Sequence, residues 1–489
     1  MKNIAFDLGG SGGKMVLGEY TGDTLTMHPL HRFKNRQINL NNSLYWNFMG
    51  IYENLLEGIS KAYAQSPDVK SVGIDSFSND FGFIDPNGVL ISQVHCYRDP
   101  RTLREEDKIY AKLSKEQLYQ MTGNQNALFN TAMQLAAMVE EGKGYFFENG
   151  NTMLLLPDLL GYFLTRQKRA EYSIASVTQM FDFKTTDWNP KILDAFGINK
   201  DMLPPIAPSG TVLGSFTKEM QEQLGIGEMQ VVSVCGHDTA SAVASLPTNK
   251  KDVAFISSGT WSLIGTEVDA PIITDQTFRG NFANEGGAEN RCRLLKNIMG
   301  LWLVQECRHT YALQGQDYSY NDLEQLARRE APFRSLIDPD DDLFYMPGNM
   351  PKKIALKCAQ TGQPVPETPG QTIRCIIESL ALKYRWALDQ IEGIVGKELK
   401  EIYILGGGGQ DNMLNQYTAN ACNRPVFAGP TEAALCGNLL MQLYAYGEIG
   451  SLREGRDLIA RSFTLKSFEP TDVALWNEAF QRFKKMFSL

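Results

Sequence analysis

A glycine-rich turn near the start of the chain carries residue types that can bind a polyanion. It reads Asp7-Leu-Gly-Gly-Ser-Gly-Gly-Lys14 and lies between two stretches that we expect to be strands. Backbone N–H groups reach phosphate oxygens only where side chains do not block the approach, and glycine leaves that approach open. Met15 after Lys14 excludes a P-loop, and the strand expected next excludes a dinucleotide fingerprint, which needs a helix there. We therefore predict a hairpin that grips phosphate, with an ordinary glycine-rich hairpin as the alternative.

Charged side chains flank this first turn on both sides. Asp7 precedes the glycines and Lys14 follows them. A carboxylate can hold Mg²⁺ through water, because Mg²⁺ prefers oxygen ligands and keeps much of its hydration shell. The Lys14 ammonium can add a point charge beside a bound phosphate.

Two more glycine turns lie in the second half of the chain, each after an apolar stretch. They are Ser257-Ser-Gly-Thr-Trp-Ser262 and the run Gly406–Gly409. One phosphate-binding turn in each half suggests a nucleoside triphosphate held between two related domains. For the run of four glycines, a flexible loop is the alternative interpretation.

An acidic residue follows a buried apolar stretch near the middle of the chain. Val231 to Cys235 reads as a strand, and Gly236-His-Asp-Thr239 comes at its end, before a helix of small residues. Acids at the carboxyl ends of strands are common catalytic groups in α/β proteins, so Asp238 could accept a proton from an attacking hydroxyl. Asp238 as a helix N-cap is the alternative. His237 is the weaker candidate base, because no carboxylate at a clear spacing would orient it.

Polar and aromatic residues alternate in the segment Asp75-Ser-Phe-Ser-Asn-Asp-Phe81, and His95-Cys-Tyr-Arg-Asp-Pro-Arg101 follows it. Hydroxyl groups of a polyol need paired donors and acceptors over an apolar face, which such a segment could supply. A hairpin with hydrogen-bonded turn carboxylates is the alternative.

These groups must be positioned by a mixed set of strands and helices. The hydrophobic pattern predicts strands at 3–8, 14–20, 69–75, 81–84, 253–257, 261–265 and 402–405, and helices at 46–64, 101–122, 131–142, 294–310, 371–396 and 431–446. A polar, turn-forming stretch at 246–252 predicts the main boundary, giving domains 1–247 and 248–489. Both halves open on a strand, a glycine turn and a second strand, which is weak evidence for duplication.

Composition sets limits on the class of protein. The 489 residues are 43% hydrophobic, enough for several domains with large cores. A formal net charge of −9 argues against nucleic acid as a partner. The sequence shows neither a signal peptide nor an apolar run of about 20 residues, so we expect a cytoplasmic protein without a membrane partner. The eight cysteines are scattered, although Cys358 and Cys375 flank a Pro/Gly-rich loop and could approach each other.

Taken together, the motifs resemble the FGGY family of carbohydrate kinases, within the actin/hexokinase-type ATPase superfamily. Within that family the nearest resemblance is to the kinases of L-rhamnulose. The resemblance runs from Asp7 to about Gly447, and its most specific parts are Asp7–Lys14, His237–Val243, Ser257–Leu263, Asn284–Gly287, Leu295–Leu303, Gly406–Gln410, Leu414–Gln416, Thr418–Ala421, Ala428–Ala433 and Gly437–Asn438.

The resemblance implies an α/β fold of two RNase H-like domains with a cleft between them, in which ATP, Mg²⁺ and a sugar bind. It implies that Asp238 is the base that deprotonates the C1 hydroxyl of a ketose. It further implies three groups of binding residues, namely Gly10, Ser11, Gly12, Gly13, Lys14, Thr260, Gln305 and Gly407 for the nucleotide, Ser78, Asp80, His237, Thr239 and Asn297 for the sugar, and Asp7 for the metal.

Two segments depart from the pattern of the L-rhamnulose kinases. Lys14 stands where arginine is usual, and Ser76-Phe-Ser-Asn-Asp-Phe81 stands where Thr-Trp-Gly-Val-Asp-Phe is usual. The departures leave the acceptor open between L-rhamnulose and another deoxyketose or polyol such as L-fuculose. A non-catalytic nucleotide switch of the actin superfamily is the more distant alternative, and the chain is expected to act as a monomer or a homodimer.

Overall fold

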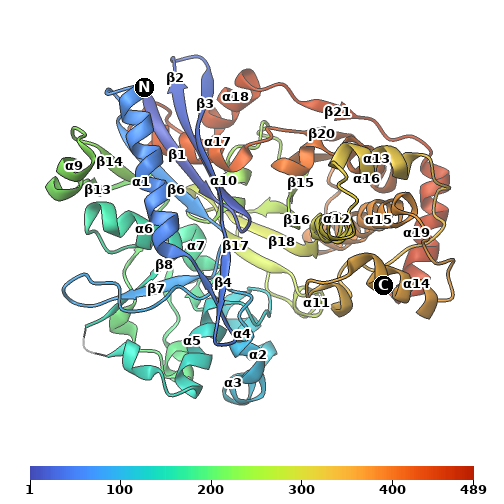
Figure 1. Cartoon of the computed structure of the whole chain (residues 1–489), viewed down its shortest axis with the longest axis horizontal. Coiled ribbons are helices and arrows are strands. Elements are labelled where there is room, and N and C mark those ends of the chain that lie inside the picture. Colours follow the sequence, from blue (N-terminus) through green and yellow to red (C-terminus); the bar gives the residue numbers. More distant parts are fainter. Residues whose placement is uncertain (149) are drawn as a thin grey trace. The chain divides into compact units, whose positions relative to one another are not determined.

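The computed structural model describes residues 1–148 and 150–489, which form two compact units. Unit 1 consists of Met1–Asn249, Glu267–Leu294 and Ala433–Phe463. Unit 2 consists of Lys250–Thr266, Leu295–Glu432 and Thr464–Leu489. Each unit therefore contains segments that are distant in sequence (Figure 1).

Unit 1 is built on a six-stranded mixed sheet in the order β13-β14-β6-β1-β2-β3. Strands β1, β2 and β3 form an antiparallel meander, whereas β6 is parallel to both β1 and β14. The predicted first strand, glycine turn and return strand are confirmed. The strands are β1 Lys2–Leu8, β2 Gly12–Tyr20, β3 Leu25–Lys34, β6 Ser71–Ser76, β13 Thr211–Ser215 and β14 Gln230–Ser233.

Both faces of β1 are buried because successive side chains point to opposite sides of the sheet. Ile4, Phe6 and Leu8 pack in a cluster with α1 (Phe48–Gln65) and α6 (Leu156–Thr165). Ala5 packs in another cluster with α10 (Asp238–Ala244) and α17 (Ala433–Ala445). The strand that carries Asp7 is thus held from two sides.

Helices α10 and α17 approach each other unusually closely. A Cβ atom added at Gly437 on α17 would lie 1.7 Å from the backbone oxygen of Ser241 on α10. Only glycine allows this approach, which brings α17 against β1 and β6.

Unit 1 has a separate core formed by helices and short strand pairs outside the six-stranded sheet. Its remaining strands pair as β4 Gln37–Leu40 with β5 Ser43–Trp46, β7 Phe81–Ile84 with β8 Thr152–Leu155, β9 Ala170–Glu171 with β12 Ile206–Ala207, and β10 Phe181–Asp182 with β11 Asp187–Trp188. Its other helices are α2 Arg101–Arg104, α3 Glu106–Lys112, α4 Lys115–Thr122, α5 Thr131–Glu140, α7 Tyr172–Ser176, α8 Pro190–Phe196, α9 Lys218–Leu224, α11 Asp275–Arg279 and α18 Leu452–Ser462.

The second large sheet has the strand order β17-β18-β16-β15-β19-β20-β21. The chain changes from one unit to the other within two of these strands, β16 and β18. Its strands are β15 Val253–Ser258, β16 Trp261–Val268, β17 Ala283–Gly286, β18 Cys292–Met299, β19 Glu401–Leu405, β20 Val426–Ala428 and β21 Lys466–Phe468. The helices of unit 2 are α12 Trp302–Leu313, α13 Tyr320–Arg328, α14 Met350–Gln360, α15 Pro369–Val395, α16 Asn412–Cys422 and α19 Val473–Phe487.

Two predicted helices differ from the structure. The predicted helix at 294–310 is wrong over its first part, where β18 runs instead and α12 begins only at Trp302. Pairing of β18 between β17 and β16 overrides its local helical pattern. A Cβ atom at Gly300, directly after β18, would lie 2.5 Å from Ser262 Oγ, so glycine allows the chain to pass close to β16 there. The predicted helix at 101–122 is divided into α2, α3 and α4. The last break arises because Ser114 begins a new helix in a capping box with Gln117.

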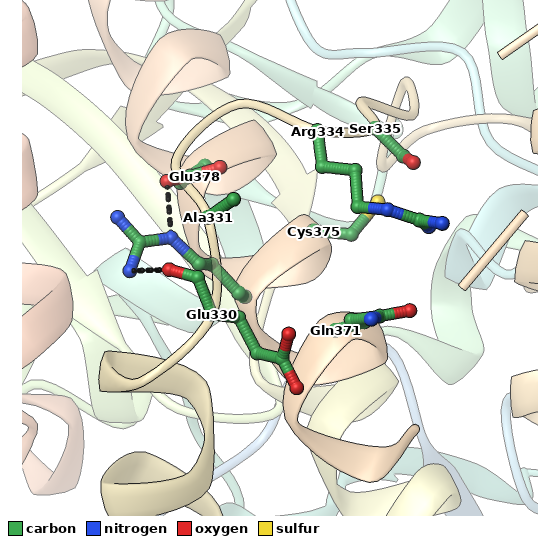
Figure 2. A pocket seen from close by; sticks show the side chains of 8 residues that line it. Glu330, Ala331, Arg334, Ser335, Gln371, Cys375 and Glu378 are labelled. Carbon is green, nitrogen blue, oxygen red and sulfur yellow. Dashed lines mark hydrogen bonds and ion pairs between the residues drawn. The ribbon is translucent and has the colours of Figure 1, made fainter. Parts of the chain in front are cut away.

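A small pocket in unit 2 is lined by residues from α15 and the segment after α13 (Figure 2). Glu378 accepts hydrogen bonds from Arg374 Nε at 2.7 Å and from the backbone N–H of Phe333 at 2.8 Å. Burial raises the pKa of Glu378 to about 7, although Arg374 acts in the opposite direction. Cys375 also lines the pocket, and its thiol lowers the pKa of the free Cys358 thiol through a hydrogen bond.

Within the part of the chain that the structure describes, no helix is both long enough and apolar enough to cross a membrane.

Replacing Gly437 by alanine should destabilise the protein by about 1–3 kcal/mol, the usual cost of overpacking. The better helix propensity of alanine contributes only about 1 kcal/mol in the opposite direction. Urea unfolding of the full chain measures the difference. Gly144→Ala is the control, because no atom lies within 4 Å of its added Cβ. Equal stability of both variants would contradict the packing described for α10 and α17.

Glu378→Gln should change how stability depends on pH. The pKa of Glu378 is raised on folding, so its contribution is present in acid and is lost as pH rises through about 7. The free energy of unfolding of the unmodified protein should therefore fall by about 3 kcal/mol relative to Glu378→Gln between pH 4.5 and 7.5. Chemical denaturation at several pH values measures this change. Glu324→Gln, which removes a partly exposed ion pair with Arg328, should show no such trend.

Candidate active site

The carboxyl ends of three parallel strands meet at one edge of the unit 1 sheet. The backbone N–H of Ser76, at the end of β6, donates to the carbonyl of Gly236 after β14 at 2.9 Å. The backbone N–H of Phe77 donates to the carbonyl of Leu8, at the end of β1, at 3.1 Å. Three predicted site segments, each far from the others in sequence, are thereby brought together.

The first glycine turn is the tip of the β1–β2 hairpin, as predicted. Gly9 N–H donates to the Gly12 carbonyl at 2.9 Å, and Asp7 pairs with Lys14 in the register of the hairpin. Gly10 and Ser11 are exposed at the tip. A Cβ atom at Gly12 would lie 2.5 Å from the Phe33 carbonyl oxygen, and one at Gly13 would lie 2.2 Å from the Phe33 ring. Glycine is required there by packing, while the tip remains open to a ligand.

Carboxyl groups gather beside this turn. Asp75 on β6 lies in register with Asp7 on β1 and is completely buried. Burial and then the Asp7 carboxyl raise the pKa of Asp75 well above its usual range, and Asp238 acts in the same direction. Asn438 Nδ2 on α17 donates to Asp75 Oδ2 at 2.6 Å, and this hydrogen bond acts to lower the pKa of Asp75. Among the described residues, no three His, Cys, Asp or Glu side chains form a ready metal cluster.

Asp238 is the first residue of α10, and His237 occupies the N-cap position without a side-chain capping bond. Asp238 is therefore not the N-cap that the alternative interpretation required. Its side chain is 31% exposed, and Thr239 Oγ1 donates to Asp238 Oδ1 at 3.0 Å. A partly exposed carboxylate at this sheet edge can accept a proton from a bound hydroxyl group.

His237 is buried and does have an orienting carboxylate, which sequence reasoning missed. Its Nδ1 lies 3.3 Å from Glu285 Oε2 on β17, and its Nε2 lies 3.5 Å from Asp238 Oδ1. Arg293 on β18 donates to Glu285 Oε2 at 3.1 Å. The motif Asn284-Glu-Gly-Gly was the only signal in the sequence for Glu285.

The predicted polyol segment is mostly buried. Asp80 is fully buried and accepts from Trp46 Nε1 at 2.5 Å, Tyr97 N–H at 3.1 Å and Gln134 Nε2 at 3.2 Å. Burial raises the pKa of Asp80 to about 7. Ser78 is half-buried and accepts a hydrogen bond from Asn79 Nδ2 at 3.0 Å.

Aromatic rings stand beside that segment. The Phe77 ring lies 4.8 Å from the Trp46 ring and 6.0 Å from the Tyr97 ring, between centroids. A Cβ atom at Gly10 would lie 3.8 Å from the Tyr97 hydroxyl oxygen, so this cluster reaches the first glycine turn. Phe77 stands where tryptophan is usual, and its ring still forms part of an aromatic cluster beside the predicted polyol segment.

Within unit 2, the predicted nucleotide residues surround the end of β15. The hairpin of β15 and β16 is confirmed, and Thr260 Oγ1 donates to Gln305 Oε1 on α12 at 3.3 Å. A Cβ atom at Gly408 would lie 2.0 Å from Ser258 Oγ, so the third glycine turn packs closely on β15 while Gly407 remains exposed. Asn297 lies on β18, and its Oδ1 is buried with no hydrogen-bond partner among the described residues.

Comparison with known proteins agrees with the geometry. The family model described as the N-terminal domain of the FGGY family of carbohydrate kinases matches residues 3–245, and the C-terminal domain model matches residues 254–446. A protein named rhamnulokinase from Bacteroides thetaiotaomicron is 39% identical over 98% of each chain. One with the same name from Bacillus subtilis is 36% identical over 96% of this chain and 95% of its own.

Solved structures show the same fold. A gluconate kinase from Lactobacillus acidophilus superposes with a TM-score of 0.81 at 16% identity, covering 100% of this chain and 98% of that one. Plasmodium falciparum glycerol kinase with ADP gives a TM-score of 0.78 at 14% identity, covering 99% and 98%. The predicted α/β, actin/hexokinase-type fold class is confirmed. The two family models together cover nearly the whole chain, so it belongs to the FGGY family of carbohydrate kinases.

Proposed function

We propose that this enzyme uses ATP to phosphorylate L-rhamnulose at O1, giving L-rhamnulose 1-phosphate. The observation that carries the proposed chemistry is the partly exposed Asp238 carboxylate at the sheet edge where β1, β6 and β14 end. The choice of sugar is supported by several relatives named rhamnulokinase that are 35–39% identical over nearly the full chain.

In the proposed reaction, Asp238 accepts the proton of the C1 hydroxyl as its oxygen attacks the γ-phosphorus of ATP. The bond between that phosphorus and the β–γ bridging oxygen breaks in line, and ADP leaves. The exposed Gly10 and Ser11 amides and the Lys14 ammonium bind phosphate oxygens and stabilise their negative charge. Exclusion of water from the bound reactants limits wasteful hydrolysis of ATP.

In this proposal the remaining site residues form two groups, one for the nucleotide and one for the sugar. Thr260, Gln305 and Gly407 contact the nucleotide in unit 2. Ser78, Asp80, His237, Thr239 and Asn297 serve the sugar, with Asp80 acting from its buried position by holding Trp46 and Tyr97. The functional domains are 1–247 and 248–489, and the enzyme works in the cytoplasm as a monomer or homodimer.

Asp7 is the proposed metal residue. Its carboxylate is half-buried at the end of β1, beside the exposed glycine tip and opposite Lys14. Magnesium commonly uses one or two carboxylates, water and substrate phosphates, so the donor set fits such a partly hydrated ion. When bound, the ion would neutralise phosphate charge.

Two other functions were open from the sequence. A kinase for L-fuculose or another polyol would use the same ATP chemistry, but the named relatives favour L-rhamnulose. A non-catalytic nucleotide switch would need neither Asp238 at the sheet edge nor a polar sugar segment.

Asp238→Asn should lower kcat by about 10²–10⁴-fold, because the amide cannot accept the hydroxyl proton. ATP affinity, measured by calorimetry, should stay within about twofold since the nucleotide contacts are unchanged. Asp275→Asn is the matched control, because Asp275 is also the first residue of a helix in unit 1. A near-normal rate for Asp238→Asn would refute its role as the base.

A coupled assay of ADP release across ketoses and polyols tests the sugar assignment. L-Rhamnulose should give the highest kcat/KM, at least about tenfold above L-fuculose, because hydroxyl-pairing sites reject mismatched analogues. A higher value for another sugar would replace the proposed acceptor, whereas ADP release independent of any sugar would favour the nucleotide switch.

Removing divalent metal with EDTA should abolish turnover, and added Mg²⁺ should restore it. Asp7→Asn should raise the Mg²⁺ concentration for half-maximal rate by about tenfold, because an amide is a weaker ligand than a carboxylate. Asp23→Asn, in the exposed turn after β2, should leave that concentration unchanged. Full activity in excess EDTA would contradict the metal requirement.

A further inference from the structure

A buried carboxyl group that has no part in the proposed reaction, that of Glu171, contacts the turn that leads to Asp238. Glu171 is the last residue of β9 and the N-cap residue of α7, where its Oε2 accepts from the Ile174 backbone N–H at 3.1 Å. The residue is only 1% exposed. Capping this helix of five residues takes one acceptor, and glutamate is not among the preferred capping residues. The other contacts of Glu171 therefore need a separate explanation.

The same carboxyl group accepts three further hydrogen bonds. The backbone N–H of Gly236 donates to Oε2 at 2.8 Å, and Ser173 Oγ donates to it at 2.6 Å. Ser209, two residues after β12, donates to Oε1, and the pairing of β9 with β12 brings these two residues together. Four donors therefore surround Glu171, and such hydrogen bonds offset the cost of burying a polar group.

Ser173 extends the contact to the next residue of the turn. Its Oγ accepts from the backbone N–H of His237 at 3.2 Å, while its own hydrogen goes to Glu171. Glu171 thus holds the N–H of Gly236 directly and that of His237 through one hydroxyl group. A Cβ atom at Gly236 would lie 3.1 Å from Glu171 Oε2, so glycine lets the carboxyl group come this close.

The carbonyl groups of the same turn are held by other elements. The Gly236 carbonyl accepts from the backbone N–H of Ser76 on β6 at 2.9 Å, within the sheet. The His237 carbonyl accepts from the backbone N–H of Ser241 at 3.0 Å, within α10. The two N–H groups directly before Asp238 depend instead on side chains of β9 and α7.

We propose that Glu171 is a positioning residue, which acts with Ser173 to fix the backbone from which Asp238 begins α10. The Asp238 side chain is 31% exposed, so the direction of its carboxylate depends on where the two preceding residues place its Cα atom. Proton transfer tolerates little displacement, since about 1 Å of misplacement can cost about 100-fold in rate. This inference rests on the proposed function for the role of Asp238 as the base.

Hydrogen exchange of the full chain, followed by mass spectrometry of a peptide that spans 234–239, reads these backbone contacts without any substrate. Glu171→Leu removes the acceptor, so the amides of Gly236 and His237 should exchange at least about tenfold faster than in the unmodified protein. Glu171→Gln keeps an oxygen acceptor and should stay within about threefold of the unmodified rate. Unchanged exchange in Glu171→Leu would overturn the proposal.

Steady-state kinetics with the best sugar substrate tests whether the fixed turn matters for turnover. Glu171→Leu should lower kcat about 10–100-fold, whereas the KM of the sugar and the affinity for ATP should stay within about twofold, because only the placement of the base changes. Glu171→Gln should keep at least about a third of kcat. Equal losses in the two variants, or a loss that lies in KM alone, would overturn the proposal.

Ser173→Ala keeps Glu171 and covers the case in which Glu171→Leu does not fold. It removes the link to the His237 N–H, and kcat should fall about tenfold. Ser176→Ala is the matched control, because Ser176 is buried on the same helix and its Oγ also accepts from a backbone N–H, that of Gly286 at 2.7 Å. The control should keep kcat within about twofold, and an equal loss in both serine variants would overturn the proposal.

Failure of the proposed function gives a different result. The unmodified protein would then show no turnover with any sugar, and hydrogen exchange alone would decide whether Glu171 fixes the turn.

Discussion

The crowding of carboxyl groups at one edge of the unit 1 sheet is the constraint on which the site depends. Asp7 and Asp75 lie in register on neighbouring strands, and the charge of Asp238 acts on Asp75. A fully buried carboxyl group there is tolerated because it favours its protonated form and receives a hydrogen bond from Asn438. The helix that carries Asn438 must therefore come very close to the sheet.

Small residues and a polar network make that approach possible. A Cβ atom at Gly73 on β6 would lie 2.3 Å from Asn438 Oδ1, and Gly437 removes the clash with α10. Gln442, one turn further along α17, donates to Asn438 Oδ1 and to the Ile4 carbonyl, both at 2.8 Å. The packing of α17 therefore also determines the surroundings of Asp75, and it requires glycine at positions 73 and 437.

Much of the site could be predicted where its signals are local in sequence. The glycine turn at the tip of β1 and β2, and an acid directly after a buried strand, each need only a few consecutive residues. The network of His237, Glu285 and Arg293 could not be predicted, because it depends on strands that meet only in the folded chain. The same long-range pairing explains why residues 294–299 form part of β18 rather than a helix. Asp80 shows a further limit, since its sequence context did not reveal that its oxygens are occupied by buried donors.

In the proposed mechanism Asp238 directs phosphoryl transfer from ATP to a single sugar hydroxyl. The most direct measurement is the structure and amount of the product, from ³¹P NMR with proton correlation after incubation with ATP and L-rhamnulose. The expected product is one phosphorylated sugar, with phosphate on O1, formed in equal amount to ADP. Phosphate on another oxygen, or ADP formed without sugar phosphate, would contradict it.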